Sequence, residues 1–180
     1  AWNDPNGGYY GSQIGGITNN NGKISNSYAN ITIVSRGTDG LSVGGVTGNN
    51  FGLVENTYVT GSITIGDNPN NRSNSIGGLT SQNSRGRTAY DQDPGRILKS
   101  YAALNYNSNE ANIAEFSGVV DRNQDALDEE PNASEAIVST VYWDQQRSGI
   151  NTGIRGKDGS ISGVKGLSTD QMTGTAAEIN

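Results

Sequence analysis

The stretch that decides the fold is a glycine-centred pentapeptide present in three copies: Ile14-Gly15-Gly16-Ile17-Thr18, Val43-Gly44-Gly45-Val46-Thr47 and Ile76-Gly77-Gly78-Leu79-Thr80. Gly44 follows Gly15 by 29 residues, and Gly77 follows Gly44 by 33. A glycine pair is typical of a place where a strand bends at a corner or where a neighbouring backbone approaches closely. Self-similarity with a period of about 20 to 50 residues indicates a repeat architecture.

Two further elements recur after the pentapeptide. The first contains a tyrosine: Lys23-Ile24-Ser25-Asn26-Ser27-Tyr28-Ala29, Leu53-Val54-Glu55-Asn56-Thr57-Tyr58-Val59 and Ile97-Leu98-Lys99-Ser100-Tyr101-Ala102. The second is an alternating run: Ile31-Thr32-Ile33-Val34 and Ser62-Ile63-Thr64-Ile65. A divergent fourth copy pairs Phe116-Ser117-Gly118-Val119-Val120 with Ile137-Val138-Ser139-Thr140-Val141-Tyr142-Trp143. Each period therefore holds three strand-like runs separated by turn-rich joints.

This pattern predicts an all-β fold, namely a parallel β-helix or β-solenoid of about four coils with inserted loops and an irregular C-terminal tail. Stacking buries the apolar side that a single coil would leave exposed. The coils are expected near residues 14–41, 42–74, 75–112 and 113–147, so the solenoid covers 1–147. Residues 148–180 are a tail or the start of a following segment, with a strand around Ile161 and a short helix starting at Ser168.

Alternation within the runs predicts which residues point inward. Ile24, Ile31 and Ile33 of one coil are expected to match Leu53 or Val54, Ile63 and Ile65 of the next. The asparagine-rich joints at residues 19–22 and 48–50 are expected to be turns with positive φ. Asparagine, serine and threonine side chains stacked at equivalent corners are expected to form hydrogen-bonded ladders.

Composition favours a thin packed core over disorder. The hydrophobic fraction is 32%, and the mean hydropathy is −0.60, which is low for a globular domain. The apolar residues are nevertheless mainly β-branched or aromatic and gather in short runs, which fits a pleated surface. A net charge of −6 disfavours nucleic acid and anionic membranes as partners. Membrane insertion is not expected, since no apolar run is long enough to span a bilayer.

The sequence contains no histidine and no cysteine. Ordinary zinc sites, Ser–His and Cys–His dyads and disulfides are therefore excluded. Acidic groups such as Asp91 with Asp93, or Asp121 with Asp125 and Asp128, leave glycoside hydrolysis by paired carboxylates open. Both groups lie in inserted, turn-rich loops, where solvated carboxylates are the simpler interpretation.

One of these loops has the D-x-N-x-D spacing with which an oxygen-lined loop wraps calcium. The predicted ligands are Asp121, Asn123, Asp125 and Glu129, and calcium is the one cofactor that the sequence suggests. The match is partial, because Ala126 and Asn132 stand where an EF-hand loop has Gly and Glu. A solvated acidic loop is the competing interpretation.

The copies differ mainly by insertion: the third adds residues 81–95 and the fourth adds much of 121–136. Function in repeat arrays concentrates on such insertions. Tyr90, Asp91 and Asp93 are therefore predicted to form a ligand-binding loop surface.

The pattern [IVL]-G-G-[ILV]-[TV]-G-x-N-x-G-x-[ILV]-x-N-[ST]-Y, best matched by residues 43–58, resembles the GLUG motif of bacterial surface and adhesin-type proteins. The sequence from Val141 to Gly174 resembles the segment that often follows GLUG repeats. Members of that family include adhesin-like exoproteins and accessory regions of immunoglobulin-cleaving metallopeptidases. The resemblance therefore implies an extracellular scaffold, at the bacterial surface or secreted, and not one particular activity.

The functional hypothesis is a non-enzymatic repeat module that acts as a spacer and as an adhesive, ligand-presenting scaffold. Its expected partners are a glycan or protein of a host or neighbouring cell, or further repeats of the same chain. Two alternatives stay open: a carbohydrate-active β-helix enzyme or accessory region of a surface peptidase, and a subunit of an extracellular filament.

Overall fold

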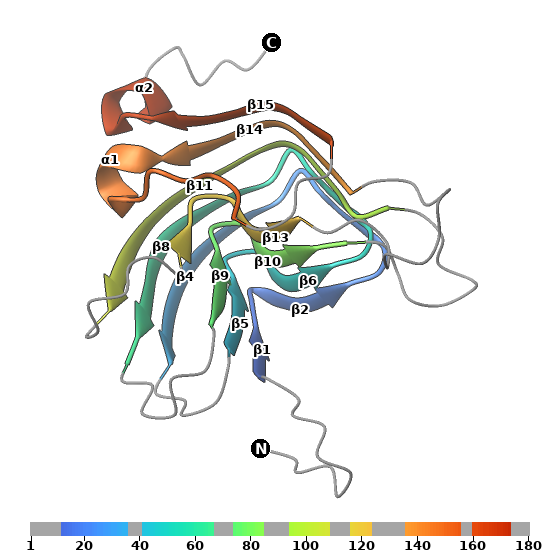
Figure 1. The fold of residues 1–180 in the computed structure, drawn as a ribbon, viewed down its shortest axis with the longest axis horizontal. Helices are drawn as coiled ribbons and strands as arrows, with labels where there is room; N and C mark the ends of the chain where they lie inside the picture. The colour runs from blue at the N-terminus through green and yellow to red at the C-terminus, as the bar shows by residue number, and fades with distance from the viewer. Residues whose placement is uncertain are drawn as a thin grey trace, which may run out of the picture.

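The computed structural model of this chain describes residues 12–35, 41–66, 74–84, 94–108, 116–123, 136–155 and 160–173. Most of these residues form strands that lie in parallel sheets, and helix is limited to two short segments (Figure 1). The predicted all-β class is therefore confirmed.

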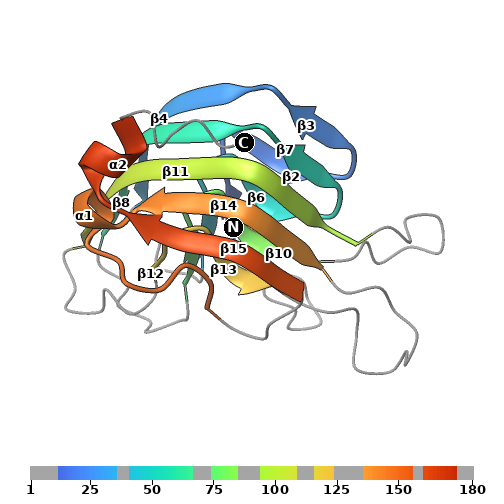
Figure 2. The ribbon, with the colours of Figure 1, turned by 90° about the horizontal axis from the view of Figure 1, so that it is seen from above.

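Three sheets are built from equivalent strands of successive repeats, all paired in parallel. The first has the order β1 (Ser12–Ile14), β5 (Leu41–Gly44), β9 (Ser75–Gly77) and β12 (Phe116–Ser117). The second has the order β2 (Ile17–Asn20), β6 (Thr47–Asn50), β10 (Thr80–Asn83) and β13 (Val120–Asn123). The third contains β3 (Lys23–Ser25), β4 (Tyr28–Ser35), β7 (Leu53–Glu55), β8 (Tyr58–Ile65), β11 (Arg96–Ser108), β14 (Ile137–Asp144) and β15 (Ser160–Leu167). Figure 2 shows this third sheet as one broad curved face.

The tyrosines mark the register of the third sheet. Tyr28 lies opposite Tyr58, Tyr58 opposite Tyr101, and Tyr101 opposite Tyr142. The predicted inward residues Ile24, Val54, Ile63 and Ile65 are buried. Their predicted matching was wrong by two residues, because Ile33 lies opposite Ile63 and Ile31 lies opposite Gly61. Val54, not Leu53, is the counterpart of Ile24.

The glycine pair allows the backbones of neighbouring repeats to approach each other closely. A Cβ on Gly78 would lie 2.0 Å from the carbonyl oxygen of Gly118 and 2.8 Å from Cβ of Ala102. A Cβ on Gly45 would likewise lie 2.2 Å from the Gly78 carbonyl oxygen. The second glycine of each pair therefore leaves room for the next repeat on one side and for the third sheet across the core.

Around these glycines, the core is a single cluster of aliphatic and aromatic side chains shared by all three sheets. Equivalent positions of successive repeats contribute Val43, Ile76 and Phe116; Val46, Leu79 and Val119; and Val59, Ala102 and Trp143.

Ile17 departs from the predicted alignment of the pentapeptides. It lies opposite Thr47 and is 47% exposed, whereas Val46 and Leu79 are buried. Ile14 is aligned with Val43, and Asn20 is aligned with Asn50. Between these two positions, the first repeat has one residue fewer than the second. The shortened corner moves Ile17 out of the core.

The predicted asparagine ladder is confirmed along the end of the second sheet. Nδ2 of Asn20 donates to Oδ1 of Asn50 (2.7 Å), Asn50 donates to Asn83 (2.7 Å), and Asn83 donates to Asn123 (2.8 Å). All four side chains are buried. The predicted positive-φ turns at residues 19–22 and 48–50 were wrong, since these backbones have no positive φ. The ladder residues instead end extended strands, which keeps their amides in line.

Positive φ occurs at the next corner, where five residues form one column through the third sheet. Asn26 (φ 50°), Asn56 (φ 49°), Lys99 (φ 48°), Thr140 (φ 55°) and Gly163 (φ 68°) are aligned by the strand register. Asparagine and glycine tolerate the left-handed region, whereas a β-branched residue is strained there. Thr140 is therefore the strained member of the column.

Changing Thr140 to asparagine is expected to stabilise the fold by about 1 kcal/mol, because a non-glycine residue in the left-handed region costs roughly 1–2 kcal/mol and asparagine is tolerated best. Urea denaturation measures the change. Thr64→Asn is the matched control, since Thr64 lies in the extended strand β8, where the same substitution should give no gain. Equal changes in both variants would contradict this explanation.

The C-terminal segment continues the sheets instead of forming a separate tail. The predicted strand and helix are present as β15 and α2 (Thr169–Thr173), and β15 pairs with β14. After β14, a short helix α1 (Gln145–Ser148) leads to a segment in which Ile154 bridges Val120. The indole Nε1 of Trp143 donates to the Ile150 carbonyl oxygen at 2.8 Å and so fixes this segment against the core.

Candidate functional site

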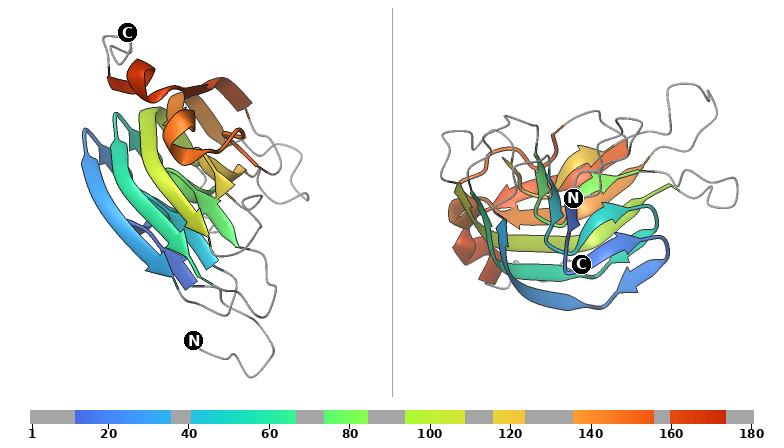
Figure 3. Two further views of the ribbon diagram at one scale, coloured as in Figure 1. Left: turned by 90° about the vertical axis from the view of Figure 1, so that its left-hand side faces the viewer. Right: turned by 90° about the horizontal axis from the view of Figure 1, so that it is seen from below.

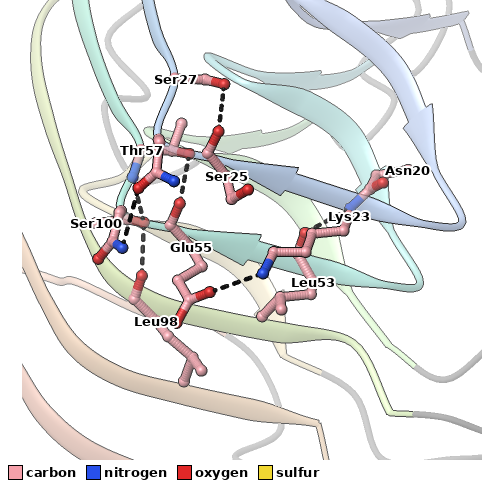
Figure 4. Close-up of polar contacts among 11 residues, drawn as sticks. Asn20, Lys23, Ser25, Ser27, Leu53, Glu55, Thr57, Leu98 and Ser100 are labelled. Carbon is pink, nitrogen blue, oxygen red and sulfur yellow. Dashed lines mark hydrogen bonds and ion pairs between the residues drawn. The ribbon is translucent and has the colours of Figure 1, made fainter.

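The tyrosine element forms a corner whose hydrogen bonds recur in successive repeats (Figure 4). In the first three repeats, a hydroxyl residue follows the left-handed residue and donates to the carbonyl oxygen two residues earlier in the chain. The three bonds are Ser27 Oγ to Ser25 O (2.8 Å), Thr57 Oγ1 to Glu55 O (3.0 Å) and Ser100 Oγ to Leu98 O (2.7 Å). Such bonds satisfy carbonyl groups at a bend. Local backbone geometry thus explains the N-[ST]-Y part of the motif. In the fourth repeat, the residue equivalent to Ser100 is Val141, which has no hydroxyl group.

The tyrosine rings themselves stack along the outer face of the third sheet. The ring centroids of Tyr28 and Tyr58 are 5.2 Å apart with planes 17° from parallel, and those of Tyr58 and Tyr101 are 5.0 Å apart at 6°. Each stacked ring covers a flat face of its neighbour. A sugar that stacks on an aromatic ring needs a free face, so Tyr58 offers only its edge, whereas Tyr28 at the end of the stack is 68% exposed.

Two phenols of this sheet, those of Tyr101 and Tyr106, have a raised pKa. Burial, together with the neighbouring Tyr58, raises the pKa of Tyr101. Burial also raises the pKa of Tyr106, whose hydroxyl donates to the Ser117 carbonyl oxygen at 3.1 Å. Because both phenols stay neutral, their role is in packing and hydrogen bonding.

Asp121 and Asn123 are the two predicted calcium ligands within the described ranges, and they contact different partners. Oδ1 of Asp121 accepts a hydrogen bond from Nε of Arg155 at 2.5 Å, and the carboxylate is fully buried. Oδ1 of Asn123 accepts the ladder bond from Asn83, and its amide donates to the Ala136 carbonyl oxygen (3.3 Å). Asp125 and Glu129 lie outside the described residues, so the calcium site stays a prediction.

The Asp121–Arg155 pair ties the fourth repeat to the segment that follows it. Arg155 also donates from Nη2 to the Asn74 carbonyl oxygen (3.0 Å). The second carboxylate oxygen of Asp121 is buried without a hydrogen-bond partner and lies 3.7 Å from Nε of Arg122. Burial raises the pKa of Asp121, and the hydrogen bond and charge of Arg155 oppose that rise.

This raised pKa predicts a specific pH dependence. The folded chain holds the Asp121 proton more tightly than the unfolded chain, so the contribution of Asp121 to stability is fully present below the unfolded pKa, about 3.9. It is lost as the pH rises through the folded pKa. Asp121→Asn, which cannot titrate, should therefore gain stability relative to the wild type between pH 4 and pH 7, as measured by urea denaturation.

The matched control for this prediction is Asp170→Asn, which removes the same charge from an exposed position. Its difference from the wild type should change less over the same pH range. A difference for Asp121→Asn that stays constant from pH 4 to pH 7 would contradict the assigned cause.

Tyr90, Asp91 and Asp93, the predicted ligand surface, lie outside the described residues. The described residues that flank the two insertions do lie together. The backbone N–H of Gly95 donates to the Ser84 carbonyl oxygen (3.0 Å), and that of Ile137 donates to the Gly95 carbonyl oxygen (2.9 Å). Both insertions therefore start and end at one corner of the fold, between the second and third sheets.

Sequence reasoning missed the partner of Asp121. Arg155 is far away in the chain, in a segment that was expected to be irregular, and no spacing signal connects the two residues. The recurrent tyrosine was found, but its stacking depends on strand register, which the insertion before Tyr101 conceals.

In the described part of the chain, no group of three or more Asp, Glu, His or Cys residues could hold a metal ion. Within the same ranges, no helix is long and apolar enough to cross a membrane. Comparison with protein families, with curated proteins and with solved structures finds no family model, no relative and no structure that matches this chain.

Proposed function

We propose that this chain is a non-catalytic β-solenoid segment of an extracellular bacterial surface protein of the GLUG-motif type. The observation that supports this proposal most is that three columns, the asparagine ladder, the tyrosine stack and the left-handed corner, continue in register from repeat to repeat. These columns use the recurrent polar side chains for contacts between repeats. A stack of this kind suits a spacer that sets the distance between the groups attached to it.

The display of ligand-binding loops is the second part of the proposal. In the second repeat, Phe51 and Gly52 alone join β6 to β7, whereas residues 84–95 join β10 to β11 and residues 124–136 join β13 to β14. Both long connections begin and end at one corner, where the backbone of Gly95 is hydrogen-bonded to the backbones of Ser84 and Ile137. A glycan or protein of another cell would be bound there.

Deletion of residues 85–93 tests this role while it keeps Ser84, Pro94 and Gly95. The short bond between Gly95 and Ser84 indicates that the two ends can be joined without moving β10 or β11. The shortened chain should keep its melting temperature within a few degrees and lose binding on glycan and matrix-protein arrays. The control is Asn107→Ala at an exposed position of β11, which should keep both.

Retention of all binding by the shortened chain would contradict the placement of the ligand site on this insertion. Release of reducing sugars from a panel of polysaccharides, abolished by Asp→Asn changes in the inserted loops (at Asp91 and Asp93, or at Asp125 and Asp128), would instead support the carbohydrate-active enzyme and overturn the proposed non-catalytic role.

A further inference from the structure

The exposed large hydrophobic side chains of the described residues all belong to the first repeat. They are Ile17 (47% exposed), Tyr28 (68%) and Val34 (58%). Tyr28 and Val34 lie on β4, whose one partner among the described strands is β8. Within the described ranges, no strand pairs with the other edge of β4, and this edge lies beside two exposed apolar side chains.

This edge lacks the usual protection against strand pairing. Exposed edge strands in monomeric proteins typically carry lysine, proline or an inward charge. Strands β1 to β4 contain a single charged residue, Lys23, which is paired with Glu55 at 3.3 Å, and they contain no proline. β4 itself has no charged residue. The edge is thus compatible with a second strand along its whole length.

The opposite end of the stack is different. The outermost strand β15 carries the exposed Lys165, and helices α1 and α2 lie at its end (Figure 3). Thr169 of α2 donates from its backbone N to Oε1 of Gln146 (3.2 Å) and from Oγ1 to Oδ1 of Asp144 (3.0 Å). These contacts fix α2 against α1, and they make a continuous head-to-tail pairing of β15 with β4 unfavourable.

The sequence of β4 is complementary to itself when it is read in the opposite direction. The order from Tyr28 to Val34 is Tyr-Ala-Asn-Ile-Thr-Ile-Val, with Ile31 at its centre. An antiparallel pair centred on Ile31 places Tyr28 opposite Val34 on the outer face, and Asn30 opposite Thr32 beside them. On the inner face it places Ala29 opposite Ile33. Aromatic–β-branched pairs directly opposite each other stabilise antiparallel strands.

We propose that the free edge of β4 pairs antiparallel with β4 of a second copy of this chain, about a two-fold axis through Ile31, to form a symmetric dimer. The axis is perpendicular to the sheet, so the outer and inner faces of both copies continue into each other. The contact extends the third sheet beyond β4 at the edge opposite to β8, and it is antiparallel, whereas β4 and β8 pair in parallel. It is isologous and closes after two copies, so it does not generate a filament.

Sedimentation equilibrium of the full chain tests the oligomeric state, and we expect a monomer–dimer equilibrium. Val34→Asp should raise the dimer dissociation constant at least about 100-fold, because two unpaired carboxylates would enter the interface. The matched control is Thr64→Asp, since Thr64 lies opposite Val34 on β8, inside the stack and away from the free edge. The control should leave the dissociation constant unchanged, and equal melting temperatures of both variants show that the fold is intact.

Cross-linking tests the register, because the chain has no cysteine of its own. Directly opposed residues of an antiparallel pair have Cα atoms about 4.5–5.5 Å apart, which suits a disulfide. An equimolar mixture of Tyr28→Cys and Val34→Cys chains should therefore form mixed disulfide dimers faster than either variant alone.

Three outcomes would overturn the proposal. A monomer at every concentration would indicate that the β4 edge is covered within its own chain. Open-ended polymers would indicate head-to-tail stacking. Cross-linking of Tyr28→Cys with itself as fast as with Val34→Cys would exclude the two-fold axis through Ile31.

Discussion

Replacement of Gly78 by alanine is expected to destabilise the fold by about 3 kcal/mol or more. The added Cβ would lie 2.0 Å from the Gly118 carbonyl oxygen and 2.8 Å from Cβ of Ala102. Neither neighbour can move freely, because one is the backbone of the next repeat and the other is a short side chain across the core. Overpacking of a dense core costs about 1–3 kcal/mol, and a clash with backbone adds to this cost.

Gly22→Ala is the matched control for this substitution. A Cβ on Gly22 would meet nothing within 4 Å, and its φ is not positive. The same chemical change should therefore stabilise the fold by about 0.5 kcal/mol, because alanine restricts the unfolded chain more than glycine does. Guanidinium denaturation gives both values, and a loss of similar size in both variants would refute the steric explanation.

Conversion of Asn83 to aspartate is expected to cost about 3 kcal/mol at pH 7 with no change in side-chain volume. The amide nitrogen of Asn83 donates to the carbonyl oxygen of Gly95 (3.0 Å) and to Oδ1 of Asn123 (2.8 Å). An oxygen in its place would face other oxygens in a buried site. Each buried polar group that loses its partner costs about 1–3 kcal/mol.

Asn107→Asp introduces the same charge at an exposed position of β11 and should change the unfolding free energy by less than about 0.5 kcal/mol. The deficit of Asn83→Asp should shrink as the pH falls below 5, because a protonated carboxyl regains a donor. A deficit that is equal in the two variants would show that the added charge, and not its place in the ladder, causes the loss. A deficit that does not respond to pH would contradict the assigned role of the ionised carboxylate.

The sequence was sufficient to predict the recurring elements, because their causes are local. The second glycine of the pair and the asparagine at the strand end recur in all four repeats, because each fills a position with the same local requirement. Register was harder to predict. The predicted partners of Ile17 and Ile33 were wrong for the same reason. The hydrogen-bonded pairing of the strands, and not similarity along the chain, decides which residues lie opposite each other.

The candidate site was predicted less well than the fold. The contact between Asp121 and Arg155 joins two repeats and has no periodic signature. The first two repeats have asparagine at the left-handed corner, whereas the fourth has Thr140. The positive φ of Thr140 therefore could not be predicted from its residue type and is seen only in the backbone of the structure. The insertions at residues 81–95 and 121–136 have no counterpart in the first two repeats, so the periodic pattern carries no signal for them.

The asparagine ladder also bears on how the chain would respond to tension. Its hydrogen bonds, like those of the parallel sheets, run along the direction in which the repeats succeed one another. A force applied between the first and the last repeat would therefore load the bonds of one terminal repeat before those of the next. Under such a load, the chain would lengthen in discrete steps, each the contour length of one repeat, and the repeats still stacked would keep their shape.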